Sequence, residues 1–152
     1  GIHNIALSND ASSDFDGLAN TDSLNVYIPR WIAQMGGNPW YNNDYAAKYV
    51  NEYNIPAGTQ GQWHLPSGGE LYKMWEVFPQ MEACARDVLG WTTAQTPMFK
   101  KDFYVSSSEY DSDEIWALST YSYPWGGWGL ARGNKTQSGY IVPVSVKSQT
   151  QN

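Results

Sequence analysis

The pattern of apolar residues changes at Gly90, and this change limits the fold more than any single motif does. Before Gly90, apolar residues recur at the three- and four-residue spacing of amphipathic helices. After Gly90, short β-rich stretches are separated by Gly, Ser and Asn, as in strands joined by turns. Helices that precede strands indicate an α+β fold rather than alternating βαβ units. We therefore expect two main helices, long loops, and a small twisted antiparallel sheet built mostly after residue 100.

The two main helices are predicted near residues 43–53 and 67–78. The first has a tyrosine-rich apolar face that begins at Tyr45. The second begins at Ser67 and Glu70, which form the Ser-x-x-Glu capping box, in which each side chain accepts a hydrogen bond from the other residue's backbone N–H. A further short helix is expected over "MEACARDVLG", closed by Gly90.

The N-terminal part of the chain carries weaker signals. Residues 2–10 alternate between apolar and polar side chains and predict a short strand. Residues 11–25 are predicted as a loop, with a turn at Asp16-Gly17. A short helix is expected through "LNVYI", and Pro29 either ends it or opens a second helical turn.

Length and charge favour one domain, at residues 1–152 with a flexible tail at 147–152, and narrow the class of partner. The formal net charge is −6, and only nine residues are Lys or Arg. This balance argues against nucleic-acid binding and against adhesion to an anionic membrane. No apolar run is long enough to insert into a membrane.

Cys84 is the one cysteine, so no intrachain disulfide is expected; it lies in a predicted helix and is expected to be a small buried side chain.

Few residues have the spacing of a catalytic or metal site. His3 and His64 share no zinc-binding spacing, and His64 is expected to be structural or merely exposed. The serines at 106–108 lack the G-x-S-x-G context of a nucleophile and are expected in a turn at a strand end.

An acidic stretch, "EYDSDE", runs from Glu109 to Glu114. We expect a solvated loop and no cofactor, with Glu109, Asp111 and Asp113 as weak candidates for a calcium site. By residue type alone, Glu109 with Asp111 or Asp113 is also a glycosidase pair, although nothing in the sequence sets the separation that this reaction needs.

Several motifs together resemble one bacterial surface-domain family. "GQWHLPSGGELYKM" is similar to the family's W-x-LP-[ST]-x-x-EL motif, and "FYVSSSEYDSDEIWAL" to its YWSS-[ST]-EY-[SD]-x-x-x-AW segment. "GLANTDSLN", "AAKYVNEY" and "SGYIVPVSV" resemble further segments in the family's order, so the match covers most of residues 17–146. The chain departs from the family pattern at Tyr104-Val105 and at Val142, and its opening hairpin is short.

The family is the one known as the major paralogous domain or the collagen-like-adhesin C-terminal domain. The resemblance implies a C-type-lectin-like fold and a non-enzymatic domain at the surface of a bacterium, so we expect an export signal outside this sequence. The EPN, QPD and WND motifs of calcium-dependent sugar binding are absent. Calcium-dependent sugar binding therefore does not carry over with the fold.

In such a fold the segment between the late strands forms the exposed binding face. Pro and Gly at 124–129 predict a turning backbone, and large apolar patches are seldom exposed without a use. Trp116 is expected to be buried. The expected ligand-binding residues are aromatic, with a polar rim: Tyr121, Tyr123, Trp125, Trp128, Arg132 and Asn134. The alternative is that two of the four aromatic residues simply cover the sheet.

Three functions are compatible with these features. The first is a recognition or adhesion domain that binds a glycan or protein ligand through aromatic loop residues. The second is a structural module of a larger cell-surface or pilus-like assembly, in which the aromatic patch is a subunit contact. The third, ranked last, is a carboxylate-dependent glycoside hydrolase.

Overall fold

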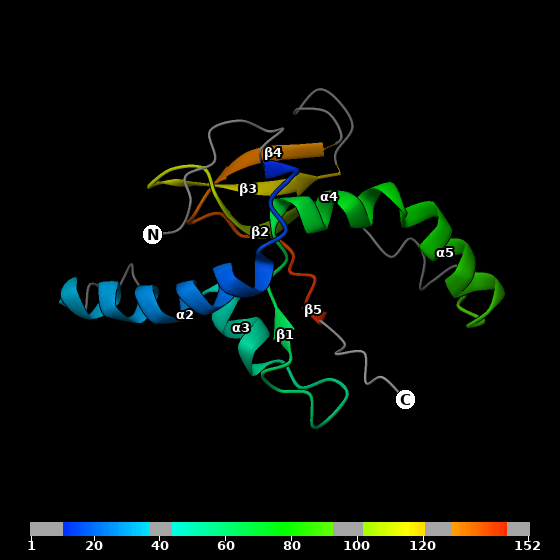
Figure 1. Cartoon of the computed structure of the whole chain (residues 1–152), viewed down its shortest axis with the longest axis horizontal. Coiled ribbons are helices and arrows are strands. Elements are labelled where there is room, and N and C mark those ends of the chain that lie inside the picture. The colour runs from blue at the N-terminus through cyan, green and yellow to red at the C-terminus, as the bar shows by residue number, and fades with distance from the viewer. Residues whose placement is uncertain (1–10, 37–43, 93–101, 121–128, 146–152) are drawn as a thin grey trace.

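Helices precede most of the strands, as the sequence predicted. The structure is a computed structural model, which describes residues 11–36, 44–92, 102–120 and 129–145. Its helices in those residues are α2 (Gly17–Gln34), α3 (Ala46–Glu52), α4 (Gly68–Glu76) and α5 (Phe78–Asp87). Its strands are β1 (Trp63–His64), β2 (Phe103–Glu109), β3 (Glu114–Ser119), β4 (Gly129–Asn134) and β5 (Val144–Ser145). The fold is mixed α+β (Figure 1).

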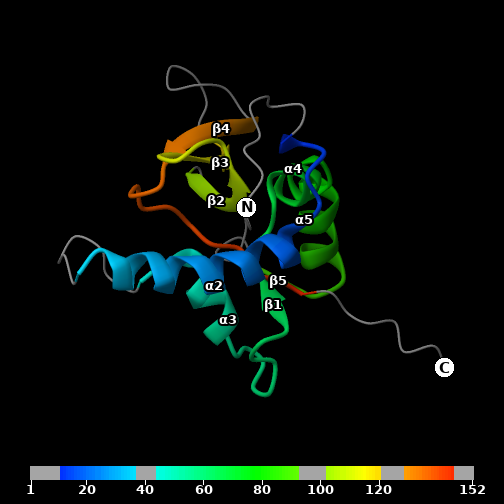
Figure 2. The same ribbon diagram turned by 60° about the vertical axis from the view of Figure 1, so that its left-hand side comes forward.

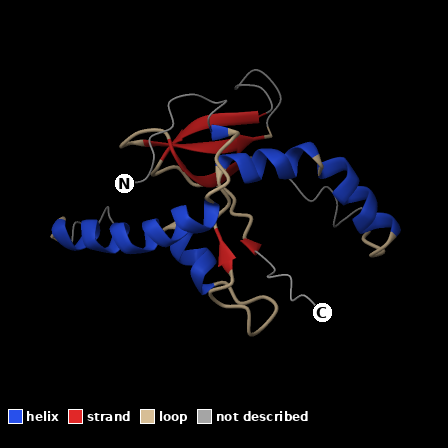
Figure 3. Cartoon of the chain, viewed as in Figure 1, coloured by secondary structure: helices blue, strands red, loops and turns tan. Residues whose placement is uncertain are grey.

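The strands form two separate antiparallel sheets. One has the order β2-β3-β4, and the other pairs β1 with β5 through Trp63 opposite Ser145 (Figure 3). Tyr140 lies beside Tyr104 of β2 in a parallel bridge, so the chain after β4 runs along the outer edge of β2 before it reaches β5. The prediction of a single sheet was therefore too simple, because β1 and β5 form a second sheet. The short helix predicted over "MEACARDVLG" is present as α5, which begins three residues earlier, at Phe78.

The core lies on both faces of the three-stranded sheet. On one face, Leu71 of α4 packs with Tyr104 and Leu118. On the other face, Val105 packs with Val50 of α3 and with Leu65. Adjacent residues of a strand point to opposite faces, so this double covering explains why β3 is buried continuously from Trp116 to its end. Figure 2 shows α4 and α5 at one side of the sheet, with α2 passing below it. The predicted burial of Trp116 is confirmed.

The capping box of α4 is confirmed in full. The Ser67 hydroxyl accepts the Glu70 backbone N–H, and the Glu70 carboxylate accepts the Ser67 backbone N–H at 2.8 Å. The predicted helix over 43–53 is present as α3, which is shorter than expected and begins after Tyr45. Gly90 has φ of 69°, which suits a glycine that follows a helix end.

Two glycines let the start of α4 approach another part of the chain. A Cβ built on Gly69 would lie 2.3 Å from the Asp14 carbonyl oxygen, and one on Gly68 would lie 2.8 Å from the Ala11 carbonyl oxygen. Both obstacles are backbone atoms, which cannot rotate away. The "SGG" of the predicted capping motif therefore fits a helix that starts against residues 11–14.

Helix α2 includes the helix predicted through "LNVYI" but begins at Gly17, so residues 17–25 of the predicted loop are helical. Its Asn-Thr-Asp-Ser composition has weak helix propensity, but tertiary contacts hold it. The Thr21 hydroxyl donates to the Gly17 carbonyl at 2.7 Å and accepts the Leu65 N–H at 2.9 Å. The helix then continues through Pro29 rather than ending there.

Two further expectations are corrected. The serines at 106–108 lie inside β2 and are buried, not in a turn. The Ser106 hydroxyl donates to the Trp116 carbonyl and the Ser107 N–H donates to the Pro66 carbonyl. Cys84 is exposed rather than buried; the buried residue of α5 is its neighbour Ala85.

The predicted strand at residues 2–10 and the predicted tail at 147–152 lie outside the described residues. None of the helices in the described part of the chain is long and apolar enough to cross a membrane.

Candidate functional site

Five polar residues from three distant segments meet at the start of α4. We call them the polar junction: Asp14, His64, Ser67, Glu70 and Ser108. The Ser67 hydroxyl donates to the Asp14 carbonyl at 2.6 Å. The Ser108 hydroxyl donates to the Asp14 carboxylate at 2.5 Å and accepts the Gly68 N–H at 2.7 Å. The start of α4 is thereby tied to Asp14, 53 residues before Ser67, and to Ser108, 40 residues after Gly68.

His64 is the deepest titratable group of the polar junction. Its side chain is 1% exposed, and its Nε2 atom lies 3.2 Å from Oε1 of Glu70. Its Nδ1 atom has no hydrogen-bond partner among the described residues. The serine hydroxyls of the junction bond to Asp14 rather than to this imidazole, so the junction has the geometry of a structural contact and not that of a nucleophile with its base.

The carboxylates of Glu109 and Asp111, in the acidic turn between β2 and β3, bind other groups of the protein. Glu109 forms an ion pair with Lys135. Asp111 Oδ1 accepts the backbone N–H groups of Asp113 and Glu114, both at 2.8 Å, and these bonds hold the pKa of Asp111 below its ordinary value. Within the described residues, no group of three or more metal-binding side chains comes together. Calcium binding by Glu109, Asp111 and Asp113 stays a prediction.

Two of the six predicted ligand-binding residues lie in the described part of the chain. Arg132 and Asn134 are two residues apart on β4 and therefore share a face of the sheet. The Arg132 guanidinium lies 4.7 Å from the centre of the Tyr110 ring and contacts Glu114 at 3.4 Å. The side-chain Oδ1 atom of Asn134 accepts the Thr136 N–H at 2.9 Å. The aromatic residues Tyr121, Tyr123, Trp125 and Trp128 lie outside the described residues, so their surface stays a prediction.

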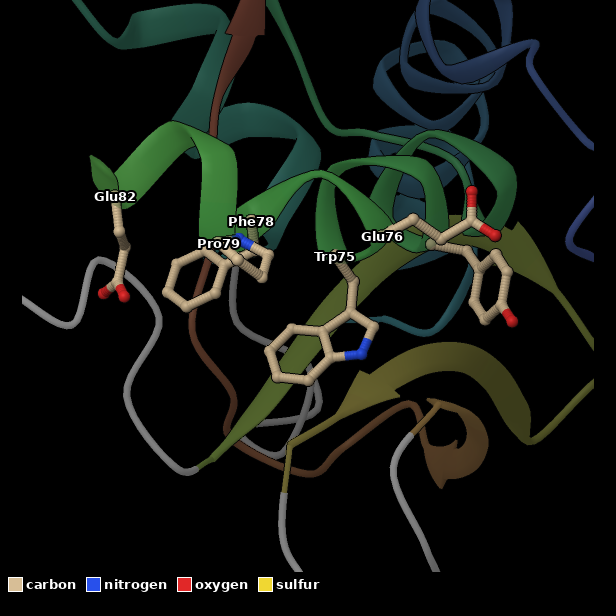
Figure 4. Close-up of a pocket in the computed structure, with 6 residues that line it drawn as sticks. Trp75, Glu76, Phe78, Pro79 and Glu82 are labelled. Atoms are coloured by element: carbon tan, nitrogen blue, oxygen red, sulfur yellow. The ribbon is translucent and has the colours of Figure 1, made fainter. Parts of the chain in front are cut away.

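A groove of different composition runs along α4 and α5. We call it the aromatic groove, and its lining residues are Tyr72, Trp75, Glu76, Phe78, Pro79 and Glu82. The rings of Trp75 and Phe78 stack at 5.6 Å between centroids and 13° between planes. Figure 4 shows these two rings on the same side of the helices, with Glu82 at one end and Glu76 at the other. The groove has a volume of about 490 Å³ and is open to solvent along much of its surface.

The sequence places these side chains together through helical spacing. Tyr72, Trp75, Glu76 and Pro79 follow the three- and four-residue steps of one helix face. Trp75 and Phe78 also pack partly against the Leu71 core, which holds their rings in place while one side remains open to the groove. Leu71, Met74, Trp75 and Phe78 form one apolar stripe by their spacing, and this spacing does not distinguish a fully packed ring from a ring with one open side. The groove was therefore not predicted.

A second hollow of about 310 Å³ lies beside the predicted ligand residues. Its lining is mostly polar and includes Asp102, Ser119, Arg132 and Gln137. The described part of this hollow lacks stacked rings, so the aromatic groove is the stronger candidate site.

No protein family, curated protein or solved structure matches this chain. The aromatic groove and the polar junction therefore have to be interpreted from their own chemistry.

Proposed function

We propose that this chain is a non-enzymatic recognition domain that binds a glycan or protein ligand through the aromatic groove. The observation that carries this proposal is a row of partly open aromatic rings, fixed by the core and flanked by Glu76 and Glu82. Rigid aromatic side chains provide large contact area at low entropic cost, and they dominate the binding energy of many interfaces. The predicted surface of Tyr121, Tyr123, Trp125 and Trp128, with Arg132 and Asn134, remains part of the proposal as a second contact region.

We further propose that the fold is C-type-lectin-like and that the domain acts at a bacterial cell surface. Supporting this are the order of helices before the main sheet, the antiparallel pairing of β1 with β5, and the family-like capping motif at Ser67. The proposal of two contact regions is contradicted if an experimental structure of the whole chain places the segment between β3 and β4 away from both the groove and the sheet.

A binding screen on glycan and peptide arrays tests the function. Tyr72→Ala and Trp75→Phe, the latter keeping an aromatic ring against the core, are expected to weaken binding of the same array ligands by about fivefold or more, as truncated interface aromatics do. Tyr49→Ala is the matched control, because Tyr49 is an exposed tyrosine outside the groove. Array binding that neither groove variant reduces would refute the groove as the site, and a complete absence of ligands would refute the recognition function.

A structural role in a larger assembly is the second candidate, and α2 favours it. The outer part of this helix exposes Val26, Tyr27, Trp31 and Met35, which is an unusual amount of apolar surface for one helix. If α2 is a subunit contact, sedimentation should show concentration-dependent association that Tyr27→Ala reduces and Tyr49→Ala does not. A monomer at all concentrations would count against this role for self-assembly.

A further inference from the structure

One face of α2 points away from the rest of the protein. The buried residues of this helix, Gly17 and Thr21, both lie in its first half. Val26 comes nine and five positions after them, which places it on the opposite side of the helix, where it is 46% exposed. Its neighbour Tyr27 is 51% exposed, and the far end of α2 extends beyond the three-stranded sheet (Figure 1). Apolar side chains on an outward face indicate a contact with another molecule.

Two opposite charges lie at equal distances from Val26 on this face. Asp22 comes four residues before Val26 and Arg30 four residues after it, and residues four apart lie on one side of a helix. Both charged residues are exposed, and neither belongs to an ion pair within the described part of the chain. Ala19 and Ala33, seven residues from Val26 on either side, are also exposed and have short side chains. A second helix can therefore approach this face closely.

A face with this arrangement is complementary to itself. When two copies of α2 lie antiparallel and cross at Val26, two-fold symmetry brings Asp22 of each copy beside Arg30 of the partner subunit. A parallel pair would instead place each charge beside its like. An unrelated partner would need its own pair of charges at the same spacing, whereas a second copy of this chain already has them.

Given a structural role in self-assembly, on which this inference rests, we propose that two copies of this chain associate through an antiparallel pairing of α2. Val26 lies at the centre of the pair, and two ion pairs between Asp22 and Arg30 flank it. Burial of Val26 and Tyr27 supplies most of the affinity, because exposed ion pairs contribute little, and the charges set the orientation. One helix from each copy makes a small interface, so the dimer is expected to be weak and dependent on concentration.

Charge reversal tests the pairing. Sedimentation equilibrium at about 0.15 M salt, where repulsion between two acidic chains is screened beyond about 8 Å, should show a monomer and a dimer in equilibrium. Asp22→Arg and Arg30→Asp should each weaken the dimer by about tenfold or more, because each change puts like charges beside each other at two places.

Two combinations of these changes should restore the dimer. The double variant with Asp22→Arg and Arg30→Asp exchanges the two charges, so its affinity should return to within about threefold of that of the unsubstituted protein. An equimolar mixture of the two single variants should also associate, because each variant then supplies the charges that the other lacks. Recovery in the mixture also shows that both single variants are folded.

Matched controls make the same charge changes elsewhere. Asp87→Arg and Arg86→Asp alter exposed side chains of α5, which lies at the other side of the molecule from α2 (Figure 1). Because charges outside the interface are screened, each control should change the dimer affinity by less than about twofold.

The inference is overturned if the single variants dimerise as well as the unsubstituted protein, or if either the double variant or the mixture fails to recover association. A dimer that ignores these charges uses another surface, so the role in self-assembly survives while the pairing of α2 fails. A monomer at every concentration refutes both, and the exposed face of α2 then belongs to a different partner. Ligand binding at the aromatic groove is tested separately on the arrays, and neither result changes it.

Discussion

Replacing Ser67 separates two contributions that the structure assigns to one hydroxyl. The hydroxyl caps α4 by accepting the Glu70 N–H, and it donates to the Asp14 carbonyl at 2.6 Å. Ser67 is fully buried, so water does not replace either bond. A cap alone is a local effect, whereas the bond to Asp14 joins α4 to a segment 53 residues away.

The two contributions respond differently to alanine and to glycine. At an N-cap, alanine costs about 1 kcal/mol relative to serine, but glycine costs only a few tenths. The hydrogen bond to Asp14 adds about 1 kcal/mol, and either substitution removes it. The Asp14 carbonyl keeps the Gly69 N–H at 3.0 Å, so it is not left unpaired and no larger penalty is expected. We therefore expect losses of about 2 kcal/mol for Ser67→Ala and about 1.3 kcal/mol for Ser67→Gly.

Urea unfolding at 25 °C measures both variants. With a slope of about 2 kcal/mol per molar urea, the midpoint should fall by about 1 M for Ser67→Ala and by about 0.6 M for Ser67→Gly. If Ser67→Gly unfolds within about 0.3 kcal/mol of the unsubstituted protein while Ser67→Ala loses about 1 kcal/mol, the hydroxyl acts only as a helix cap. The bond to Asp14 would then contribute nothing to stability.

Three further substitutions test other parts of the fold. Gly69→Ala should destabilise the protein by about 1–3 kcal/mol, because its methyl group meets the Asp14 carbonyl oxygen; an unchanged thermal midpoint would show that the segment yields easily. Leu71→Ala should cost about 2–5 kcal/mol, whereas Val88→Ala, at an exposed position, should stay within about 0.5 kcal/mol in the same denaturant series. Asp111 has a lowered folded pKa, so its stabilisation is present above the ordinary value of 3.8 and is lost as pH falls through the folded value. Asp111→Asn, which keeps an oxygen acceptor, should therefore flatten the acid limb of a stability–pH curve, and an identical acid limb would exclude this role.

The sequence predicted best what is determined locally. The capping box at Ser67 and Glu70 depends on residues three positions apart, and it is present as expected. The α+β arrangement was predicted from the change in apolar spacing at Gly90, and this spacing is also a property of residues that are close in the sequence.

What the sequence did not predict depends on contacts between distant segments. Helix α2 forms although its first half has weak helix propensity, because Thr21 bonds to Leu65 across 44 residues. The serines at 106–108 are strand residues because Ser106 donates to the Trp116 carbonyl and Ser108 donates to Asp14. No local pattern contains these partners.

The aromatic groove was missed for a related reason. Periodicity assigns Trp75 and Phe78 to the inner face of a helix, which is correct for the side of each ring that contacts the core. Periodicity does not reveal that the other side faces a hollow, because that depends on where α5 turns after Val77.

The polar junction also has a consequence for the order of folding events. Its bonds close chain segments of 53 and 94 residues, and the entropy of closure grows with the logarithm of segment length, by about 0.5 kcal/mol between these two. In the first turn of α4, the Gly68 N–H donates to Ser108 and the Gly69 N–H donates to Asp14. The hydrogen bonds of this turn are therefore complete only after β2, which contains Ser108, has packed against it. A chain whose best helix start depends on such distant partners is expected to fold more slowly than a helical bundle of equal size, and the amide hydrogens of Gly68 and Gly69 are expected to exchange with solvent only when the whole domain opens.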